Sequence, residues 1–210
     1  MKKLLPIILS AFACAPTAAL CQPLMTYTYA DVAYQWTHID ESGLNDANGV
    51  DTQLSFSPAK HFALEGGYNY LSTKAHADLL GDRVNFNVDQ NTFSYGGAGW
   101  YSLQDDLDIV ARVGGIHARA NVSGSGLDET VSDNGVYTGL TLRYLATQEL
   151  ETDLYVLYDH IETTTWSYGL TGLYKVHENV ALKGEAAIND DTDIALLAGV
   201  RIAMEDMNLL

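Results

Sequence analysis

The chain has 210 residues, with 11 lysines and arginines against 27 aspartates and glutamates, and a formal net charge of −16. This length fits a single domain. The acid excess argues against nucleic acid as a partner, because phosphate binding needs clustered basic residues. No run of about 18 apolar residues follows the N-terminal region, so we expect no membrane-spanning helix.

The N-terminus has the order of features found in a secretory signal peptide. Lys2 and Lys3 form a positive start, residues 4–15 are apolar but too short to span a bilayer, and Ala19-Leu20-Cys21 offers a cleavage site. We therefore expect residues 1–21 to be removed on export and residues 22–210 to form the mature domain.

Cysteine usage agrees with export. Both cysteines, Cys14 and Cys21, lie in the predicted signal region, so the mature chain would contain no disulfide. Removing the two signal lysines leaves 9 bases against 27 acids, a net charge of −18. Attachment of a lipid to Cys14 or Cys21 is an alternative, although Leu20 and Phe12 fit a lipid-attachment motif poorly.

Apolar and polar residues alternate with a period of two along the mature chain, as in strands with one wet and one apolar face. Most alternating segments have about 9–12 residues, the length that a tilted strand needs to cross a bilayer. They lie at 26–37, 49–57, 62–71, 91–102, 107–119, 136–146, 150–160, 165–176, 180–188 and 194–204. The prediction is an all-β, closed, antiparallel transmembrane barrel of about ten strands, with eight or twelve strands as alternatives.

The connections alternate in length, as they do in outer-membrane barrels with short periplasmic turns and longer external loops. The short turns lie at 57–61, 103–106, 147–149 and 177–179, and the external connections at 38–48, 72–90, 120–135, 161–164 and 189–193. An even strand number would bring both termini to the periplasm. The first and last segments should pair, because a strand in hydrocarbon cannot leave its edge unpaired.

Charged residues gather on one face of the segments. In the last segment, Val200 and Ile202 share an apolar face, whereas Arg201 lies on the other. An uncharged face suits lipid and the opposite face suits a wet interior. The predicted lumen-lining residues are Asp31, Asp51, Glu65, Asp108, Arg112, Arg143, Glu151, Asp153, Lys175, Lys183, Glu185 and Arg201. We interpret them as ion pairs that fill a narrow barrel, with a narrow polar pore as the alternative.

Aromatic residues on the apolar face sort by height into two predicted membrane-interface belts. Near the periplasmic edge we place Phe56, Phe62, Tyr101, Tyr144 and Tyr174. Near the outer edge we place Trp36, Tyr68, Tyr70, Phe93, Tyr95, Tyr158, Trp166 and Tyr168. A soluble sandwich has no reason to sort its aromatic residues in this way.

Three short motifs carry a family resemblance. Residues 95–101 read Tyr-Gly-Gly-Ala-Gly-Trp-Tyr and precede an acidic turn at 105–108, Asp133-Asn134-Gly135-Val136 opens a strand, and Ala198-Gly199-Val200-Arg201 lies in the last segment. With them the chain resembles the small Gram-negative outer-membrane β-barrel proteins, many of them porin-like. The resemblance implies contact with outer-membrane lipid and lipopolysaccharide, and insertion by the barrel-assembly machinery. Such barrels commonly end in an aromatic residue, whereas this chain ends 204–210 without one.

The glycine-rich motif at 96–99 is not a phosphate-binding loop, because it lies inside a predicted strand and no helix follows it. Glycines there let a strand bend or let an aromatic neighbour pack over the backbone.

Asp159 and His160 suggest one alternative, a hydrolase site at the outer rim, omptin-like or lipid-modifying, with an Asp that activates water. Adjacent strand residues point to opposite faces, which argues against it. Two acidic segments resemble fragments of calcium loops: Asp46, Asn48 and Asp51 around Gly49, and Asp190, Asp191 and Asp193. Neither has the full ligand set.

We therefore predict no catalytic residues, no cofactor and no resident metal, with divalent cations at the acidic loops as partners. The predicted function is a non-enzymatic outer-membrane barrel, serving as a structural or surface-interaction protein or as a narrow porin-like channel. The rim hydrolase and a soluble periplasmic β-sandwich binding module are the alternatives.

Overall fold

A computed structural model of the chain describes residues 25–40, 44–79, 82–124 and 127–204. The predicted signal peptide and the tail after Met204 lie outside the described residues. Those residues form ten strands and contain no helix long and apolar enough to cross a membrane. The strands are β1 (Tyr29–His38), β2 (Ala47–Ala59), β3 (Phe62–Leu79), β4 (Asp82–Gln104), β5 (Leu107–Gly124), β6 (Leu127–Leu145), β7 (Leu150–His160), β8 (Thr164–His177), β9 (Val180–Asn189) and β10 (Ile194–Ala203).

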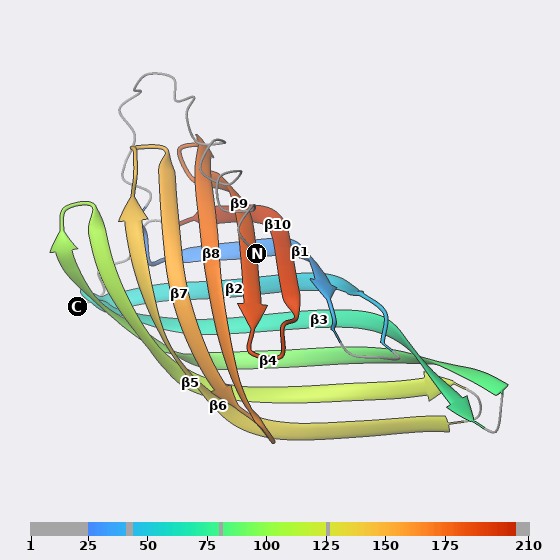
Figure 1. The fold of residues 1–210 in the computed structure, drawn as a ribbon. Helices are drawn as coiled ribbons and strands as arrows, with labels where there is room; N and C mark the ends of the chain where they lie inside the picture. Colours follow the sequence, from blue (N-terminus) through green and yellow to red (C-terminus); the bar gives the residue numbers. More distant parts are fainter. Residues whose placement is uncertain (1–24, 41–43, 80–81, 125–126, 205–210) are drawn as a thin grey trace.

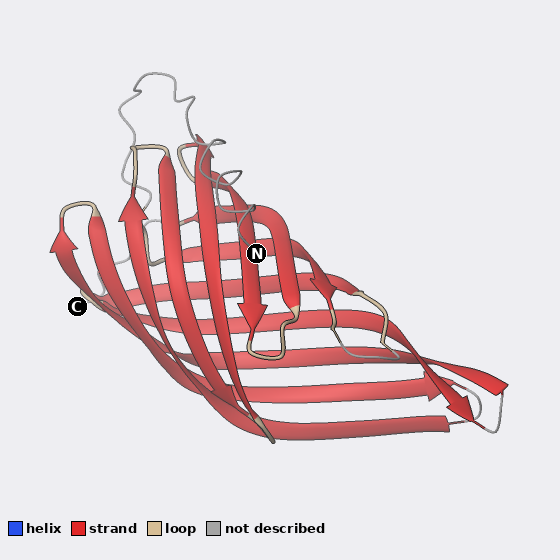
Figure 2. Cartoon of the chain, viewed as in Figure 1, coloured by secondary structure: helices blue, strands red, loops and turns tan. Residues whose placement is uncertain are grey.

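Each strand pairs antiparallel with its neighbours in sequence, and β1 pairs with β10, so the sheet closes into a barrel (Figures 1 and 2). The closing register runs from Tyr29 opposite Ala203 to His38 opposite Ile194. Closure confirms the predicted fold class with ten strands. It also shows that the alternative of a soluble β-sandwich is wrong, since one continuous sheet surrounds the interior.

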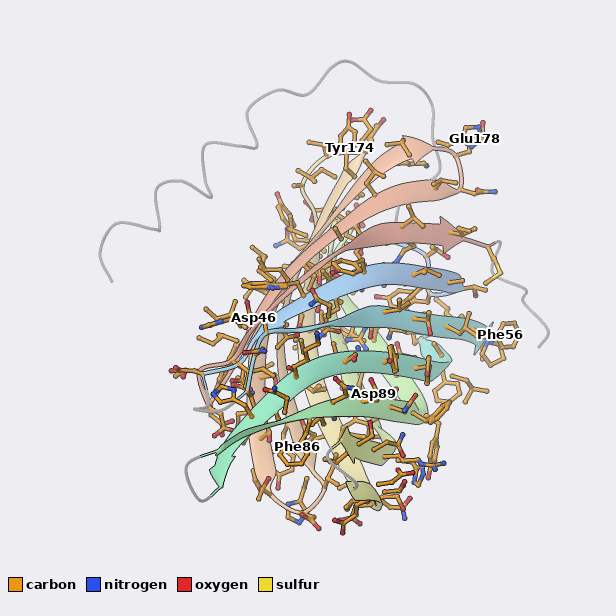
Figure 3. The ribbon with its side chains drawn as sticks, turned by 90° about the vertical axis from the view of Figure 1, so that its right-hand side faces the viewer. Asp46, Phe56, Phe86, Asp89, Tyr174 and Glu178 are labelled. Atoms are coloured by element: carbon orange, nitrogen blue, oxygen red, sulfur yellow. The ribbon has the colours of Figure 1, made fainter. Side chains whose placement is uncertain are left out.

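The barrel has two distinct ends. One end, here called the terminus end, holds both ends of the described barrel and the turns between β2 and β3, β4 and β5, β6 and β7, and β8 and β9. The other, the loop end, holds the remaining connections. In Figure 3, Phe56 and Glu178 lie toward the terminus end, and Asp46 and Phe86 lie toward the loop end.

Two predicted loops are strands. Residues 72–79, 82–90, 120–124 and 127–135 extend β3, β4, β5 and β6 well past the other strands at the loop end (Figure 1, lower right). The register stays continuous there, from Ser72 opposite Asp89 to Leu79 opposite Asp82. We call this four-stranded part the extension.

The prediction failed in the extension because the outer face there is no longer apolar. In the barrel wall, outward positions such as Tyr68 are apolar. In the extension the same outward positions carry polar residues such as Lys74 and Asn87, while the lumen-side face carries Ala75 and Val88. A search for an apolar outer face therefore ends where the outward positions become polar, although the strands continue.

The glycine-rich motif of β4 has the role expected from its position. A Cβ on Gly96 would lie 2.6 Å from the hydroxyl of Tyr137, and one on Gly97 would lie 3.2 Å from Cε2 of Phe62. Glycine thus lets two aromatic rings, one on each face of the sheet, lie directly on the backbone.

Candidate functional site: the barrel lumen

The structure places all twelve predicted lumen-lining residues on the inner face of the barrel. Most of them are nearly inaccessible to solvent, and Glu151 is completely buried. The twelve are distributed over nine strands, so only closure of the sheet brings them together. The buried charged members are Asp31, Glu65, Asp108, Arg143, Glu151, Asp153, Lys175, Lys183 and Arg201.

A bidentate ion pair joins the first and last strands at the seam where the barrel closes. Arg201 of β10 donates from Nε and Nη2 to the two carboxylate oxygens of Asp31 on β1, both at 2.8 Å. Lys183 lies 3.5 Å from the same carboxylate, and the guanidinium of Arg201 lies over the ring of Tyr29 at 3.8 Å. The residue pair that closes the barrel is therefore also its most fully satisfied charge pair.

A second pair spans the opposite wall. Arg112 of β5 donates from Nε to both carboxylate oxygens of Glu65 on β3, at 3.1 and 3.2 Å. Its Nη1 donates to the hydroxyl of Thr141 on β6. Arg112 thus ties three strands together through one side chain.

Arg143 forms the third centre, nearer the terminus end. It donates from Nε to Glu151 at 2.9 Å and lies 3.8 Å from Asp153. One oxygen of each acid, Oε2 of Glu151 and Oδ1 of Asp153, is buried without a hydrogen-bond partner in the described structure. Glu151 also lies 3.9 Å from Nη1 of Arg201, so the two carboxylates and the two guanidinium groups form one buried cluster of charges.

The segment before β1 packs inside the barrel at its terminus end. The ring of Tyr27 stacks on Trp100 of β4, with centroids 3.6 Å apart and planes 7° apart. Its hydroxyl donates to Asp108 at 2.6 Å, and Arg143 lies over its other side at 4.5 Å. Tyr27 also packs with Val110 and two alanines in a small apolar core. We call Tyr27 and Trp100 the plug.

Sequence reasoning missed the plug. The period of two in the predicted segment 26–37 places Tyr27 on the same face as Asp31, but neither Tyr27 nor Trp100 was singled out as a lumen residue, and Trp100 was read only as part of a glycine-rich motif. The period of two does place Trp100 on the same face as Ala98 and therefore in the lumen. No local signal indicates that Tyr27 folds back to meet it.

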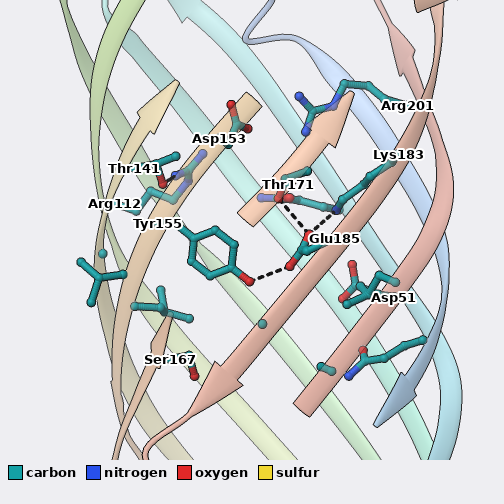
Figure 4. A pocket seen from close by; sticks show the side chains of 18 of the residues that line it. Asp51, Arg112, Thr141, Asp153, Tyr155, Ser167, Thr171, Lys183, Glu185 and Arg201 are labelled. Carbon is teal, nitrogen blue, oxygen red and sulfur yellow. Dashed lines mark hydrogen bonds and ion pairs between the residues drawn. The ribbon is translucent and has the colours of Figure 1, made fainter. Parts of the chain in front are cut away.

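A cavity of about 360 Å³ occupies the lumen beyond the plug, toward the loop end (Figure 4). Its walls carry Asp51, Tyr155, Thr171, Lys183 and Glu185. Glu185 accepts hydrogen bonds from Tyr155 at 2.6 Å and Thr171 at 3.2 Å, and lies 3.2 Å from the ammonium group of Lys183. The cavity is therefore polar and its charges are largely paired.

Uncharged side chains bond to two of the lining residues, Gln35 and Asp51. Asn69 donates to Gln35 at 2.6 Å and to Asp51 at 3.3 Å. Tyr155 lies across Gly169, where a Cβ would stand 2.2 Å from its Cζ. Tyr155 and these amides were not among the predicted residues, because a search for charges passes over neutral groups of the same inner face.

All thirteen predicted belt residues lie on the outer face, and they sort by height. Phe56, Phe62, Tyr101, Tyr144 and Tyr174 lie near the turns of the terminus end, and the other eight lie farther toward the loop end. Neighbouring rings pair in the second group, as Tyr68 with Phe93 and Tyr158 with Trp166.

The predicted hydrolase pair does not form. Asp159 faces the lumen side and His160 the outer side of β7, and His160 Nδ1 lies 3.1 Å from the hydroxyl of Thr164. The alternation of the strand separates the two side chains, as their adjacency in sequence implied.

The two acidic segments do not gather into cation sites. Asp46 contacts His38 at 2.7 Å and Asn48 accepts from Tyr34 at 2.7 Å, both on the outside, whereas Asp51 faces the lumen. In the second segment the carboxylates accept backbone N–H groups, as Asp193 does from Asp40 and Asp190 from Trp166. Within the described ranges no three His, Cys, Asp or Glu residues are grouped to hold a metal.

Comparison with solved structures finds β-barrels of outer membranes. The KdgM porin in complex with disordered oligogalacturonate matches with a TM-score of 0.52 at 11% identity, covering 84% of this chain and 99% of that one. The translocator domain of the autotransporter NalP from Neisseria meningitidis matches with a TM-score of 0.56 at 10% identity, covering 84% and 88%. Ail, the attachment invasion locus protein of Yersinia pestis, matches at 0.43 and 13% identity, covering 84% and 100%.

At such identities the likenesses to KdgM and to the NalP translocator domain show the fold alone. No curated protein matches the chain. The family model of the outer membrane protein beta-barrel domain matches residues 6–198. Because this match spans nearly the whole chain, the protein belongs to the outer-membrane β-barrel family.

Proposed function

We propose that this outer-membrane barrel conducts no solutes and acts from its loop end as a surface-interaction protein. The observation that carries the proposal is the plug. Tyr27 and Trp100 stack face to face across the terminus end, and the buried pair of Arg143 and Glu151 lies beside them. A solute would have to displace an aromatic stack and separate a buried ion pair.

The lengths of the connections at the two ends of the barrel support an orientation in which the loop end faces outward. Short turns are typical of the periplasmic end of such barrels and longer connections of the external end. The loop end would then face outward, together with the extension. The proposal also takes the belts as membrane interfaces and residues 1–21 as the export signal.

Planar-bilayer recording tests the closed lumen. The protein should insert without a measurable conductance, whereas a Tyr27→Ala/Trp100→Ala variant should show openings because the plug is removed. Insertion is checked separately by heat-modifiable migration on a gel. Steady conductance of the unaltered protein would overturn the proposal.

A narrow porin is the second candidate, and the cavity of about 360 Å³ favours it. The cavity already provides the outer half of a polar path, so withdrawal of residues 25–28 would complete it. This candidate predicts conductance in the unaltered protein that increases with applied voltage or low pH, which the same recordings detect.

A further inference from the structure

The extension has one covered edge and one open edge. On the β3 side, the connection between β1 and β2 covers the edge: Leu44 forms a bridge with Ala75, and the N–H of Asn45 donates to the carbonyl of Lys74 at 2.9 Å. On the other side, β7 pairs with β6 only from Val136 onward. Among the described residues, β6 pairs with β5 over 128–134 but has no strand on its other side, and it forms the outermost ribbon of the extension at the lower right of Figure 1.

The backbone of this open edge can be assigned residue by residue. The N–H of Asn134 donates to the carboxylate of Asp133 at 2.7 Å, so it does not point to β5. Backbone groups alternate sides along a strand. The N–H and C=O groups of Asp128, Thr130 and Ser132 therefore point to the open side, and these three residues are exposed.

Unpaired strand edges recruit other strands, and proteins that avoid recruitment place charges on them. The edge of β6 carries only one sign of charge. Glu129 and Asp133 lie on the lumen-side face with Val131 between them, and Asp128 lies on the other face. Val131 is 52% exposed. Like charges placed side by side oppose pairing with a second acidic strand, and opposite charges favour it.

We propose that the open edge of β6, residues 128–134, receives an extended basic segment of a partner protein as an added strand. Residues of the added strand that lie beside Glu129, Val131 and Asp133 share one face. The matching five-residue segment therefore has basic residues at its first and fifth positions, a β-branched residue at its third, and any residue at the other two. Main-chain hydrogen bonds supply affinity in such additions, and the alternate side chains supply specificity. The pattern reads the same in both chain directions, so parallel and antiparallel additions both satisfy it.

This inference rests on the proposed function only in requiring that the loop end faces outward. Conductance tests the plug and leaves the edge untouched. Binding at the edge is measured on the full barrel in detergent, where both ends are accessible, so failure of one proposal leaves the other standing.

The probe is the acetylated and amidated peptide Ser-Lys-Ser-Val-Ser-Lys-Ser. Its control, Lys-Ser-Ser-Val-Ser-Ser-Lys, has the same composition but places both lysines on the face opposite valine. The first peptide should bind and the control should bind about tenfold more weakly, since both favourable cross-strand charge pairs are lost. Equal binding of the two peptides would mean charge attraction without strand addition and would overturn the proposal.

Variants of the barrel locate the site. Ser132→Pro removes an N–H that points to the open side of β6 and should abolish binding. Ser132→Ala keeps that N–H and should bind the peptide as the unaltered protein does. Glu129→Gln/Asp133→Asn should weaken binding about fivefold to tenfold. Retained binding in the proline variant would exclude strand addition at this edge.

Amide hydrogen exchange in the unaltered protein tests strand addition even if the proline variant does not fold. Peptide binding should slow exchange of the amides of Thr130 and Ser132 in the unaltered protein, and leave Val131 unchanged because its N–H already points to β5. Absence of new protection would overturn the proposal. So would a doubling of mass without peptide, since the edge would then serve a second copy.

Discussion

Tyr27 and Trp100 lie in parallel at 3.6 Å, although one precedes the first strand and the other belongs to the fourth. The stack holds the segment before β1 against the inner face of β4. It is reinforced by the hydrogen bond from Tyr27 to Asp108 and by the cation above the ring. The plug is therefore a tertiary contact between distant segments, and each of its components can be removed separately.

The stack should show a measurable coupling energy. In a double-mutant cycle of Tyr27→Leu and Trp100→Leu, we expect a coupling of about 0.5–1.5 kcal/mol, the range for aromatic pairs beyond their buried area. Urea unfolding of the barrel in lipid vesicles measures it. Additive effects of the two substitutions would contradict a direct stack.

The pair of Asp31 and Arg201 should be the most sensitive point of the seam. Asp31→Asn leaves a buried guanidinium with one carboxylate fewer, and removal of one partner of a buried pair costs about 3–5 kcal/mol. The unfolding midpoint in urea should fall accordingly. The double variant Asp31→Leu/Arg201→Met should recover part of the loss, because no unpaired charge remains; a double variant less stable than the single one would refute this account.

Gly169 should tolerate no side chain, whereas Gly172 on the same strand should. A Cβ at Gly169 would overlap the ring of Tyr155 at 2.2 Å, and one at Gly172 meets no atom within 4 Å. Gly169→Ala should displace Tyr155, weaken its bond to Glu185 and lower the unfolding midpoint. Gly172→Ala is the matched control and should change the midpoint little; equal effects would show that the ring does not matter.

The two kinds of tryptophan should differ in their access to lipid. Trp166 lies on the outer face and is 42% exposed, whereas Trp100 lies inside against Tyr27. In single-tryptophan variants, brominated lipids should quench Trp166 strongly and Trp100 weakly. Quenching of Trp166 by lipids brominated near the headgroup, rather than at the chain ends, would place it in the predicted belt. Strong quenching of Trp100 would contradict its position in the lumen.

The sequence alone determined the wall of this barrel. Strand period, strand length and the segregation of charge depend on local alternation, which can be recognised from neighbouring residues in the sequence. Thus Arg201 could be assigned to the inner face from Val200 and Ile202. All twelve lumen charges and all thirteen belt aromatics were assigned to the faces on which the structure places them.

Tertiary structure alone decided which contacts fill the lumen and which strands extend beyond the barrel wall. Which acid meets which base, as Asp31 meets Arg201, depends on the register of the seam, and register is set by closure of the whole sheet. Tyr27 enters the lumen through contacts with residues far along the chain. The extension was not predicted because its strands lack an apolar outer face, and only their continuous register with the barrel wall shows that the strands go on.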